Sequence, residues 1–132
     1  MQGDTSRDRL TVLVVDDYED GRALLRRLLE TKGFRVIEAA DGEEAIEAVR
    51  RECPDLILMD LNMPRVDGLT AARKIRECKE LCGGVAMVAV TAYDVYGMKE
   101  AAEEAGCDAY MAKPIHEGEF DRTLRRLLPG WL

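Results

Sequence analysis

Five short apolar runs alternate along this chain with segments whose apolar residues recur at helical spacing. The runs are nearly continuous and rich in β-branched residues, which is typical of strands buried on both faces of a parallel sheet. Short connections between such strands and helices require right-handed crossovers, with helices covering both faces of the sheet. The sequence therefore predicts a doubly wound α/β fold with five parallel strands and five helices.

Glycine, proline and helix-capping residues indicate where these helices and strands begin and end. Asp41-Gly-Glu-Glu44 has the form of a capping box, in which Asp41 accepts from the start of a helix and Glu44 reaches back. A further helix runs from about Asp67 into Glu80. The predicted strands are Leu10–Val15, Phe34–Ile37, Asp55–Met59, Val85–Val90 and Ala109–Ala112. Apolar stripes of the predicted helices lie at Leu24–Leu29, Ala45–Val49, Leu69–Ile75, Met98–Ala105 and Phe120–Leu128.

Size and charge exclude several classes of partner. The 132 residues suit one domain, and 19 basic against 26 acidic residues give a net charge of −7. A domain with net negative charge is a poor candidate for binding nucleic-acid phosphates. It also lacks the excess of basic residues that attracts a protein to anionic lipid. No apolar run has the length of a membrane span. We expect a flexible polar tail over residues 1–9, one domain over residues 10–132, a cytoplasmic location, and no direct nucleic-acid or membrane partner.

The chain has few of the serine and histidine residues that nucleophilic catalysis and zinc binding commonly use. The chain has one serine, Ser6, and one histidine, His116, which argues against a Ser-His-Asp site, and no spacing supports a Cys-His pair. Neither of the common glycine-rich nucleotide-binding motifs is present. The cysteines have no CxxC spacing, so we expect reduced thiols rather than a zinc site or a disulfide framework. They are Cys53, Cys78, Cys82 and Cys107.

Polar side chains stand where the predicted strands end. Asp16 and Asp17 follow the first strand, and Asp60 follows the third. Thr91 ends the fourth strand, and Lys113 follows the fifth. Because the carboxyl ends of parallel strands meet at one edge of a sheet, we expect these groups to converge. Clustered carboxylates repel one another, and a divalent cation with a preference for oxygen ligands relieves that repulsion.

The segments around these residues occur in a recognisable order. They are Val14-Val-Asp16-Asp17, Leu58-Met-Asp60-Leu-Asn-Met-Pro64, Asp67-Gly68, Val90-Thr91-Ala92 and Ala112-Lys113-Pro114. Together they resemble the motifs of receiver domains of two-component response regulators, and the resemblance extends from about Leu10 to Leu128. It implies the flavodoxin-like strand order 2-1-3-4-5. It also implies a phosphorelay signalling module that catalyses only its own phosphorylation and dephosphorylation.

The resemblance gives each site residue a role. Asp60 would accept a phosphoryl group from a phosphohistidine on a sensor histidine kinase or phosphotransfer protein. Mg²⁺, or Mn²⁺, would be held by Asp17, Asp60 and the backbone carbonyl of Asn62, with Asp16 acting mainly through a metal-bound water. Lys113 would neutralise charge on the transferring group, and a cis bond to Pro114 is usual in the family.

A switch accompanies phosphorylation in this family. By resemblance, the Thr91 hydroxyl would turn toward the phosphoryl group and Tyr110 would fill the space behind it. This movement would alter the face formed by the fourth strand and the fourth and fifth helices, which could bind an unidentified output protein or a second copy of the chain. As an alternative, Tyr110 is only a half-buried packing residue.

Several alternatives remain open at the level of sequence. A small Mg²⁺-dependent phosphatase with an aspartate nucleophile would need a second acid two residues after Asp60, where Asn62 stands. A receiver cut from a hybrid histidine kinase and a phosphorylation-independent receiver are two others. Tyr93, two residues after Thr91, could shield an acyl phosphate from water. His116 is expected to be exposed at the start of the last helix, and Trp131 either covers part of the core or serves a partner.

Overall fold

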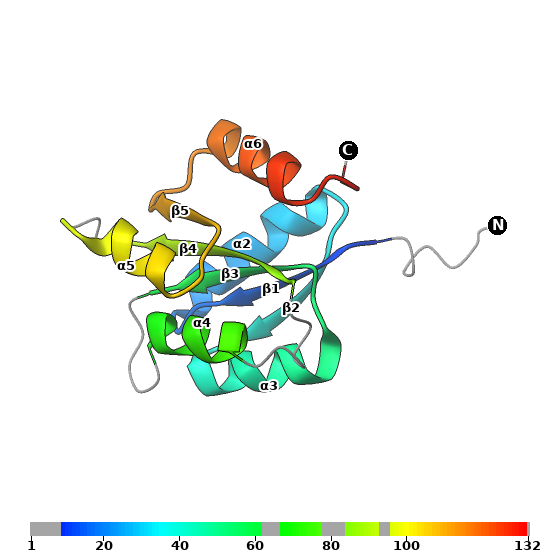
Figure 1. Cartoon of the computed structure of the whole chain (residues 1–132). Helices are drawn as coiled ribbons and strands as arrows, with labels where there is room; N and C mark the ends of the chain where they lie inside the picture. The colour runs from blue at the N-terminus through cyan, green and yellow to red at the C-terminus, as the bar shows by residue number, and fades with distance from the viewer. Residues whose placement is uncertain (1–8, 62–66, 78–83, 93–95, 132) are drawn as a thin grey trace.

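The computed structural model describes residues 9–61, 67–77, 84–92 and 96–131 of the chain. Five strands in these ranges form one sheet with the order β2-β1-β3-β4-β5, and every neighbouring pair is parallel (Figure 1). The predicted fold class and strand order are therefore confirmed. The strands are β1 (Thr11–Val15), β2 (Arg35–Ala39), β3 (Leu56–Asp60), β4 (Ala86–Thr91) and β5 (Ala109–Ala112).

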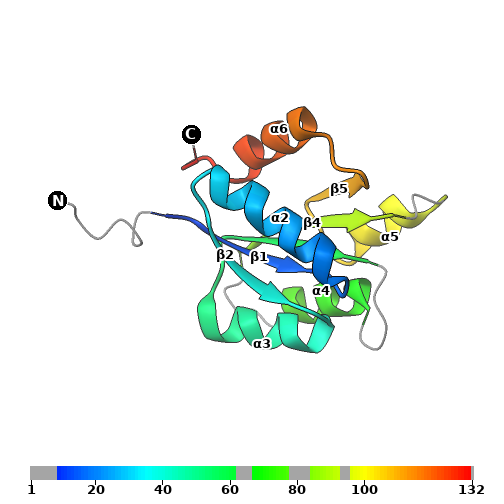
Figure 2. The same ribbon diagram turned by 180° about the vertical axis from the view of Figure 1, so that it is seen from behind.

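Five helices in the described ranges cover the two faces of the sheet, as predicted. They are α2 (Glu19–Thr31), α3 (Gly42–Glu52), α4 (Gly68–Glu77), α5 (Met98–Glu104) and α6 (Glu117–Leu127). Helices α2 and α6 pack on one face, and α3, α4 and α5 pack on the other (Figures 1 and 2). Of these described helices, none is long and apolar enough to cross a lipid bilayer.

Strand β1 shows why the apolar runs are nearly continuous. Val12 and Val14 belong to the core under α2 and α6, whereas Leu13 and Val15 belong to the core under α3, α4 and α5. Successive side chains of a strand point to opposite faces, so a strand covered on both faces must be apolar at every position. All four side chains are at most 1% exposed.

The predicted capping box starts α3. The Asp41 side chain accepts a hydrogen bond from the Glu44 backbone N–H at 2.8 Å. The Glu44 carboxylate in turn accepts from the backbone N–H of Ala40 at 2.8 Å. The first bond satisfies an amide group that a helix start otherwise leaves unpaired, and the second satisfies the amide of Ala40, the residue before the N-cap.

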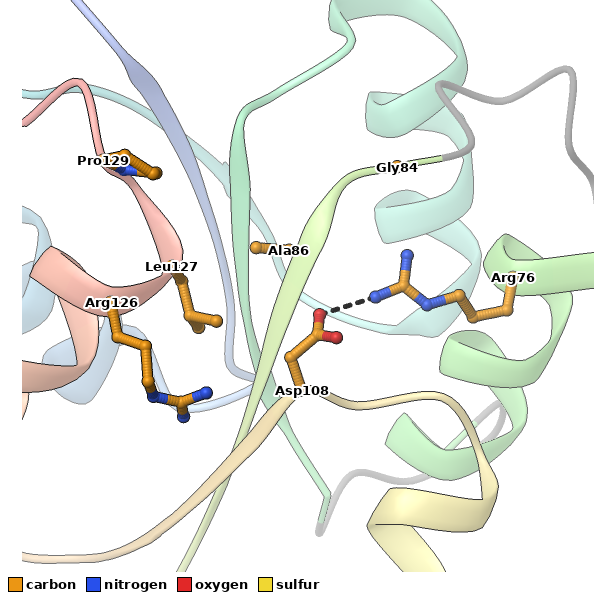
Figure 3. A pocket seen from close by; sticks show the side chains of 7 residues that line it. All are labelled: Arg76, Gly84, Ala86, Asp108, Arg126, Leu127 and Pro129. Carbon is orange, nitrogen blue, oxygen red and sulfur yellow. Dashed lines mark hydrogen bonds and ion pairs between the residues drawn. The ribbon is translucent and has the colours of Figure 1, made fainter.

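An arginine joins three segments at the amino-terminal edge of the sheet (Figure 3). The Arg76 guanidinium donates to the carbonyls of Gly106 and Val85 at 2.8 and 2.6 Å, and to the Asp108 carboxylate at 2.7 Å. Arg76 and Asp108 border a cavity of about 450 Å³ that Arg126 and Pro129 also line. Each guanidinium nitrogen of Arg76 already donates a hydrogen bond within the protein. We therefore assign Arg76 a structural role in connecting these segments.

Of the two cysteines in the described residues, one agrees with the prediction and one does not. Cys107 is a free, buried thiol, as expected. Cys53 is disulfide-bonded, so the prediction of reduced thiols is wrong for this residue. Cys78 and Cys82 lie outside the described residues. The spacing of cysteines reports on metal-binding motifs, but it does not report which thiols the fold brings within bonding distance.

The carboxyl-terminal tryptophan covers part of the core. The Trp131 ring stacks on Phe34 with 5.4 Å between ring centroids, and its indole N–H donates to the Lys32 carbonyl at 3.1 Å. This contact selects the first of the two interpretations left open for Trp131. His116 is exposed at the N-cap of α6, as predicted.

Candidate phosphoacceptor site

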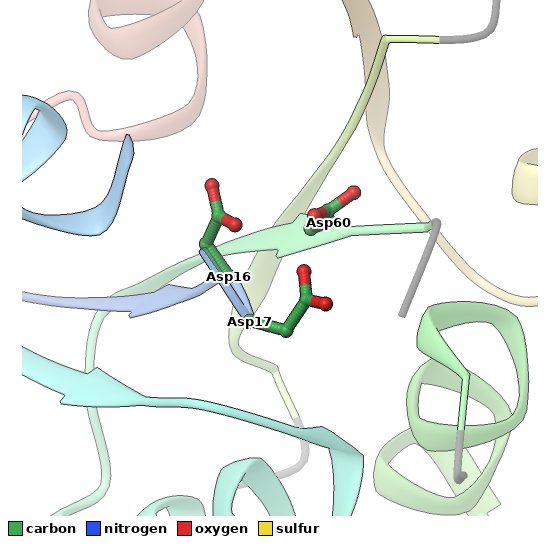
Figure 4. Close-up of side chains that lie close together, drawn as sticks. All are labelled: Asp16, Asp17 and Asp60. Atoms are coloured by element: carbon green, nitrogen blue, oxygen red, sulfur yellow. The ribbon is translucent and has the colours of Figure 1, made fainter. Parts of the chain in front are cut away.

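Three aspartates meet at the carboxyl edge of the sheet (Figure 4). Asp16 directly follows β1 and Asp60 is the last residue of β3, and these two strands are neighbours with Val15 paired to Met59. One oxygen from each of Asp16, Asp17 and Asp60 lies within 4.8 Å of the others. Asp16 and Asp60 are buried, whereas Asp17 is exposed. The predicted convergence of the carboxylates is therefore present in the fold.

Lys113 brings a positive charge to this acidic cluster from the end of β5. Its Nζ lies 3.0 Å from an Asp16 carboxylate oxygen and 3.9 Å from an Asp60 oxygen. Its backbone N–H donates to the Thr91 carbonyl at 2.7 Å, which ties the end of β5 to the end of β4. The Lys113–Pro114 peptide bond is cis, as the resemblance implied. One ammonium against three carboxylates leaves the cluster negatively charged.

Thr91 and Tyr110 lie on the strands next to Asp60. Thr91 is fully buried at the end of β4, the strand between those that carry Asp60 and Lys113. Tyr110 is half-buried and packs against the core on the side of α3, α4 and α5. The structure thus brings Thr91 to the site edge, and Tyr110 lies one strand further along. Asn62 and Tyr93 lie outside the described residues.

Glycine is required where α4 starts beside the site. A Cβ atom on Gly68 would lie 2.2 Å from the Asp60 carbonyl oxygen and 2.8 Å from the Leu61 Cα. No side chain fits at such distances, so the Asp67-Gly68 motif permits a close approach of α4 to the backbone of Asp60. Asp67 accepts from the Thr70 N–H at 2.8 Å and caps this helix start.

Sequence reasoning missed one residue of the site, Arg22 of α2. Its Nη1 donates to the Asp16 carbonyl at 2.9 Å, and its Nε donates to the Glu38 carboxylate at 2.8 Å. Hydrogen bonds from Arg22 and Arg26 lower the pKa of Glu38. An arginine on the polar face of an amphipathic helix has no sequence signal that distinguishes it from a solvated one.

The donor set suits a hard divalent cation. Carboxylate oxygens are ligands that Mg²⁺ prefers, and one or two of them are usual at its sites. Both oxygens of Asp16 already accept hydrogen bonds, one from the Tyr18 N–H at 2.9 Å and one from Lys113 at 3.0 Å. This arrangement fits direct ligation by Asp17 and Asp60, with Asp16 acting through a water.

The fold and the site together define a doubly wound α/β domain with an acidic cluster and a lysine at the carboxyl edge of its sheet. A family model described as the response regulator receiver domain matches residues 12–125. The chain belongs to this family, whose members are domains of two-component signalling.

Individual relatives agree with this assignment. The chain is 36% identical over 118 residues to the polar-differentiation response regulator DivK of Brucella ovis, a match that covers 89% of this chain and 95% of DivK. It superimposes with a TM-score of 0.83 and 34% identity on the receiver domain of a sensor histidine kinase from Pseudomonas aeruginosa, covering 92% of this chain and 98% of that one. That structure is described as having a magnesium ion coordinated in the active site cleft.

A third similar structure carries a modified aspartate. It is a response regulator protein from Burkholderia pseudomallei, described as having a phosphorylated aspartic acid, a calcium ion and citrate. The TM-score is 0.78 and the identity 27%, and the match covers 87% of this chain and 66% of that one.

Proposed function

We propose that this chain is a phosphoacceptor in a two-component system, in which Asp60 takes a phosphoryl group from a phosphohistidine of a sensor histidine kinase or phosphotransfer protein. The observation that carries the proposal is the position of Lys113 Nζ, 3.0 Å from Asp16 and 3.9 Å from Asp60 in an otherwise acidic cluster. Phosphoryl transfer depends mainly on positioning and on positive charge around the transferring group.

The proposed transfer uses Asp60 as the nucleophile. An Asp60 oxygen forms a bond to phosphorus while the bond between phosphorus and the imidazole nitrogen breaks, and the electron pair of that bond returns to the imidazole. Lys113 lies close enough to Asp60 to bind an oxygen of the incoming group. Bound Mg²⁺ would supply further positive charge, held by Asp17, Asp60 and the Asn62 carbonyl.

Incubation with acetyl phosphate and Mg²⁺, followed by intact mass measurement, tests this proposal. We expect a phosphoryl adduct on the parent protein and none on Asp60→Ala or after removal of Mg²⁺ by a chelator. Asp20→Ala is the matched control, because Asp20 is an exposed aspartate at the start of α2. An adduct on Asp60→Ala would contradict the assignment of the nucleophile.

Two other results would favour other functions. Sustained turnover of para-nitrophenyl phosphate would indicate a phosphatase, although receiver domains are signalling domains and Asn62 stands where such an enzyme needs an acid. No adduct on the folded parent protein would indicate a receiver that acts without phosphorylation.

A groove beside the site is the proposed docking surface of the phosphohistidine protein. The groove has a volume of about 450 Å³, is mainly apolar, and runs from Asp16 and Lys113 along α2. Its residues are Asp16, Tyr18, Gly21, Leu24, Leu25, Leu28, Lys113, Pro114 and Ile115. Tyr18 and Leu24 are 65% and 69% exposed, which is high for large apolar side chains. A partner bound here would hold its phosphohistidine next to Asp60.

The docking surface can be tested separately from the chemistry. We expect Leu24→Arg to retain phosphorylation by acetyl phosphate and to lose transfer from any phosphohistidine protein that phosphorylates the parent. Ala23→Arg on the same helix is the control, because Ala23 is exposed and does not line the groove. Equal losses with both phosphodonors would contradict the docking role of Leu24.

The proposed response to phosphorylation is the Thr91 and Tyr110 switch. Thr91 is buried between the strands that carry Asp60 and Lys113, and Tyr110 packs beside α5. A phosphoryl group has strong acceptor oxygens for the Thr91 hydroxyl. We expect the side chains of both residues to change rotamer in a crystal structure with beryllofluoride, a phosphoryl mimic. Identical rotamers with and without the mimic would contradict the switch. Pairing of two copies through the face of α5 and α6 stays a prediction.

A further inference from the structure

Arg22 holds the peptide group that joins the two adjacent aspartates of the site. Its Nη1 donates to the Asp16 carbonyl at 2.9 Å, and this carbonyl belongs to the peptide that leads into Asp17. The orientation of that peptide sets the direction in which the Asp17 side chain leaves the backbone. Asp17 is exposed, so it depends on its backbone for its position more than the buried Asp16 does.

The other hydrogen bonds of Asp16 involve its amide and its carboxylate, whereas Arg22 bonds to its carbonyl. The Asp16 N–H donates to the Ala39 carbonyl at 3.1 Å, which ties the residue to β2. The Asp16 carboxylate accepts from the Tyr18 N–H at 2.9 Å and from Lys113 at 3.0 Å. These bonds hold the amide and the side chain of Asp16, whereas Arg22 holds its carbonyl.

Arg22 is itself held in place. Its Nε donates to Glu38 on β2 at 2.8 Å, and its side chain is only 17% exposed. Glu38 also accepts from Arg26, one helical turn further along α2. The planar guanidinium has several donors in a fixed geometry, so one group can bridge Glu38 and the Asp16 carbonyl at once.

The helix that carries Arg22 packs closely against Asp16. A Cβ atom on Gly21 would lie 3.0 Å from an Asp16 carboxylate oxygen. A glycine at this position therefore lets the first turn of α2 approach the acidic cluster. The same close approach brings the next residue, Arg22, within reach of the Asp16 carbonyl.

We propose that Arg22 is a positioning residue of the acidic site, which orients the Asp16–Asp17 peptide so that Asp17 presents its carboxylate to the divalent cation. The inference rests on the proposed function for the identity of the ligand, and it adds a residue outside the acidic cluster and Lys113. Groups that orient metal ligands typically change metal affinity by about 10- to 100-fold when removed.

The sign of the effect separates positioning from simple electrostatics. Removing a positive charge beside the cluster reduces repulsion of a cation, so electrostatics alone predicts tighter Mg²⁺ binding by Arg22→Gln. Loss of positioning predicts weaker binding. Arg27→Gln on the same helix makes the same change of charge at an exposed position and serves as the matched control.

Isothermal titration with MgCl₂ tests the inference in the full chain. We expect Arg22→Gln to weaken Mg²⁺ binding about tenfold and Arg27→Gln to leave it within about twofold of the parent. Amide hydrogen exchange in metal-free protein is the second readout, because the Tyr18 N–H bonds to Asp16 across the held peptide. We expect this amide to exchange faster in Arg22→Gln only, with the core strands equally protected in all three proteins.

The outcomes distinguish the two proposals. Unchanged or tighter Mg²⁺ binding by Arg22→Gln would overturn the positioning role while leaving the phosphoacceptor function intact. If the parent itself binds no Mg²⁺, the proposed metal site fails and so does the positioning of its ligand. Unaltered exchange of the Tyr18 amide in Arg22→Gln would overturn the claim that Arg22 fixes this peptide, whatever the metal affinity.

Discussion

At the scale of single residues, Lys113 has both a structural and a chemical role. Its ammonium lies between two buried carboxylates, those of Asp16 and Asp60. We expect Lys113→Met to lower the free energy of unfolding by about 1–3 kcal/mol without metal, since a hydrogen bond between charged groups contributes about that amount. The loss should shrink in Mg²⁺, because a bound cation offsets the same charges. Adduct formation with acetyl phosphate should slow.

Urea unfolding with and without Mg²⁺ measures the prediction for Lys113. Lys74→Met is the control, because Lys74 is exposed on α4. A loss of stability that is the same in both conditions would show that the ammonium and the cation do not act on the same carboxylates.

Cys107 gives a prediction for alkaline pH. Burial raises the pKa of this thiol from 9.0 to about 11, with Arg76 opposing the change and Asp108 adding to it. The folded protein therefore holds the thiol proton more tightly than the unfolded chain does. This contribution to stability is complete below pH 9.0 and is lost as the pH rises toward about 11.

Cys107→Ala removes that part of the pH dependence. We expect the difference in unfolding free energy between the parent and Cys107→Ala to fall by about 2–3 kcal/mol over this pH range, since each pKa unit corresponds to about 1.4 kcal/mol. Urea unfolding of the two proteins at a series of pH values measures it. A constant difference would contradict a raised pKa.

At the scale of secondary-structure elements, the start of α4 constrains the position of Asp60. A Cβ atom on Gly68 would lie 2.2 Å from the Asp60 carbonyl oxygen, so Gly68→Ala must displace either α4 or the end of β3. Such overpacking costs about 1–3 kcal/mol. We expect a lower urea midpoint together with slower adduct formation on Asp60.

The same substitution at Gly118 provides the comparison. Gly118 lies in α6, where an added Cβ would meet only the end of the Arg122 side chain at 3.7 Å. We expect Gly118→Ala to raise the free energy of unfolding by about 0.5–1 kcal/mol through helix propensity and to leave adduct formation unchanged. Equal stability of the parent and Gly68→Ala would contradict the close approach.

Features encoded by local patterns could be predicted at this scale, whereas those that depend on contacts between elements could not. The Asp41 and Glu44 capping box and all five strands follow from side-chain type and period, and their predicted limits agree to within about two residues. Asp16 and Asp60 could be placed together because a parallel sheet aligns strand ends. The roles of Arg22 and Gly68 and the disulfide of Cys53 depend on which surfaces pack together, which no local pattern reports.

At the scale of the whole molecule, the carboxyl edge of the sheet holds the candidate site, and the amino-terminal edge holds contacts that stabilise the fold. The carboxyl edge gathers the buried carboxylates of Asp16 and Asp60 and the half-buried ammonium of Lys113. The amino-terminal edge gathers contacts that hold the elements together, such as those of Arg76 with Asp108 and of Trp131 with Phe34. Changes at the amino-terminal edge should therefore alter stability without altering the chemistry of the site.

Trp131 allows this separation to be tested. Its ring stacks on Phe34 and lies 5.6 Å from the Arg125 guanidinium, and its indole N–H donates to the Lys32 carbonyl. It therefore links the chain after α6 to the connection between α2 and β2. We expect Trp131→Ala to lower the free energy of unfolding by about 2–3 kcal/mol, below the range for a fully buried aromatic residue because Trp131 is half-buried. Trp131→Phe retains stacking and should lose about 1 kcal/mol, the contribution of one hydrogen bond.

Urea unfolding followed by circular dichroism measures these changes, since Trp131 is the single tryptophan and its fluorescence is lost with it. Mg²⁺ affinity and adduct formation with acetyl phosphate should stay at the parent values in both variants under conditions where they remain folded. A Trp131→Phe protein with parent-like stability and slower adduct formation would contradict the separation. It would mean that the packing of α2 against the carboxyl-terminal residues reaches the acidic cluster, through the helix that also carries Arg22.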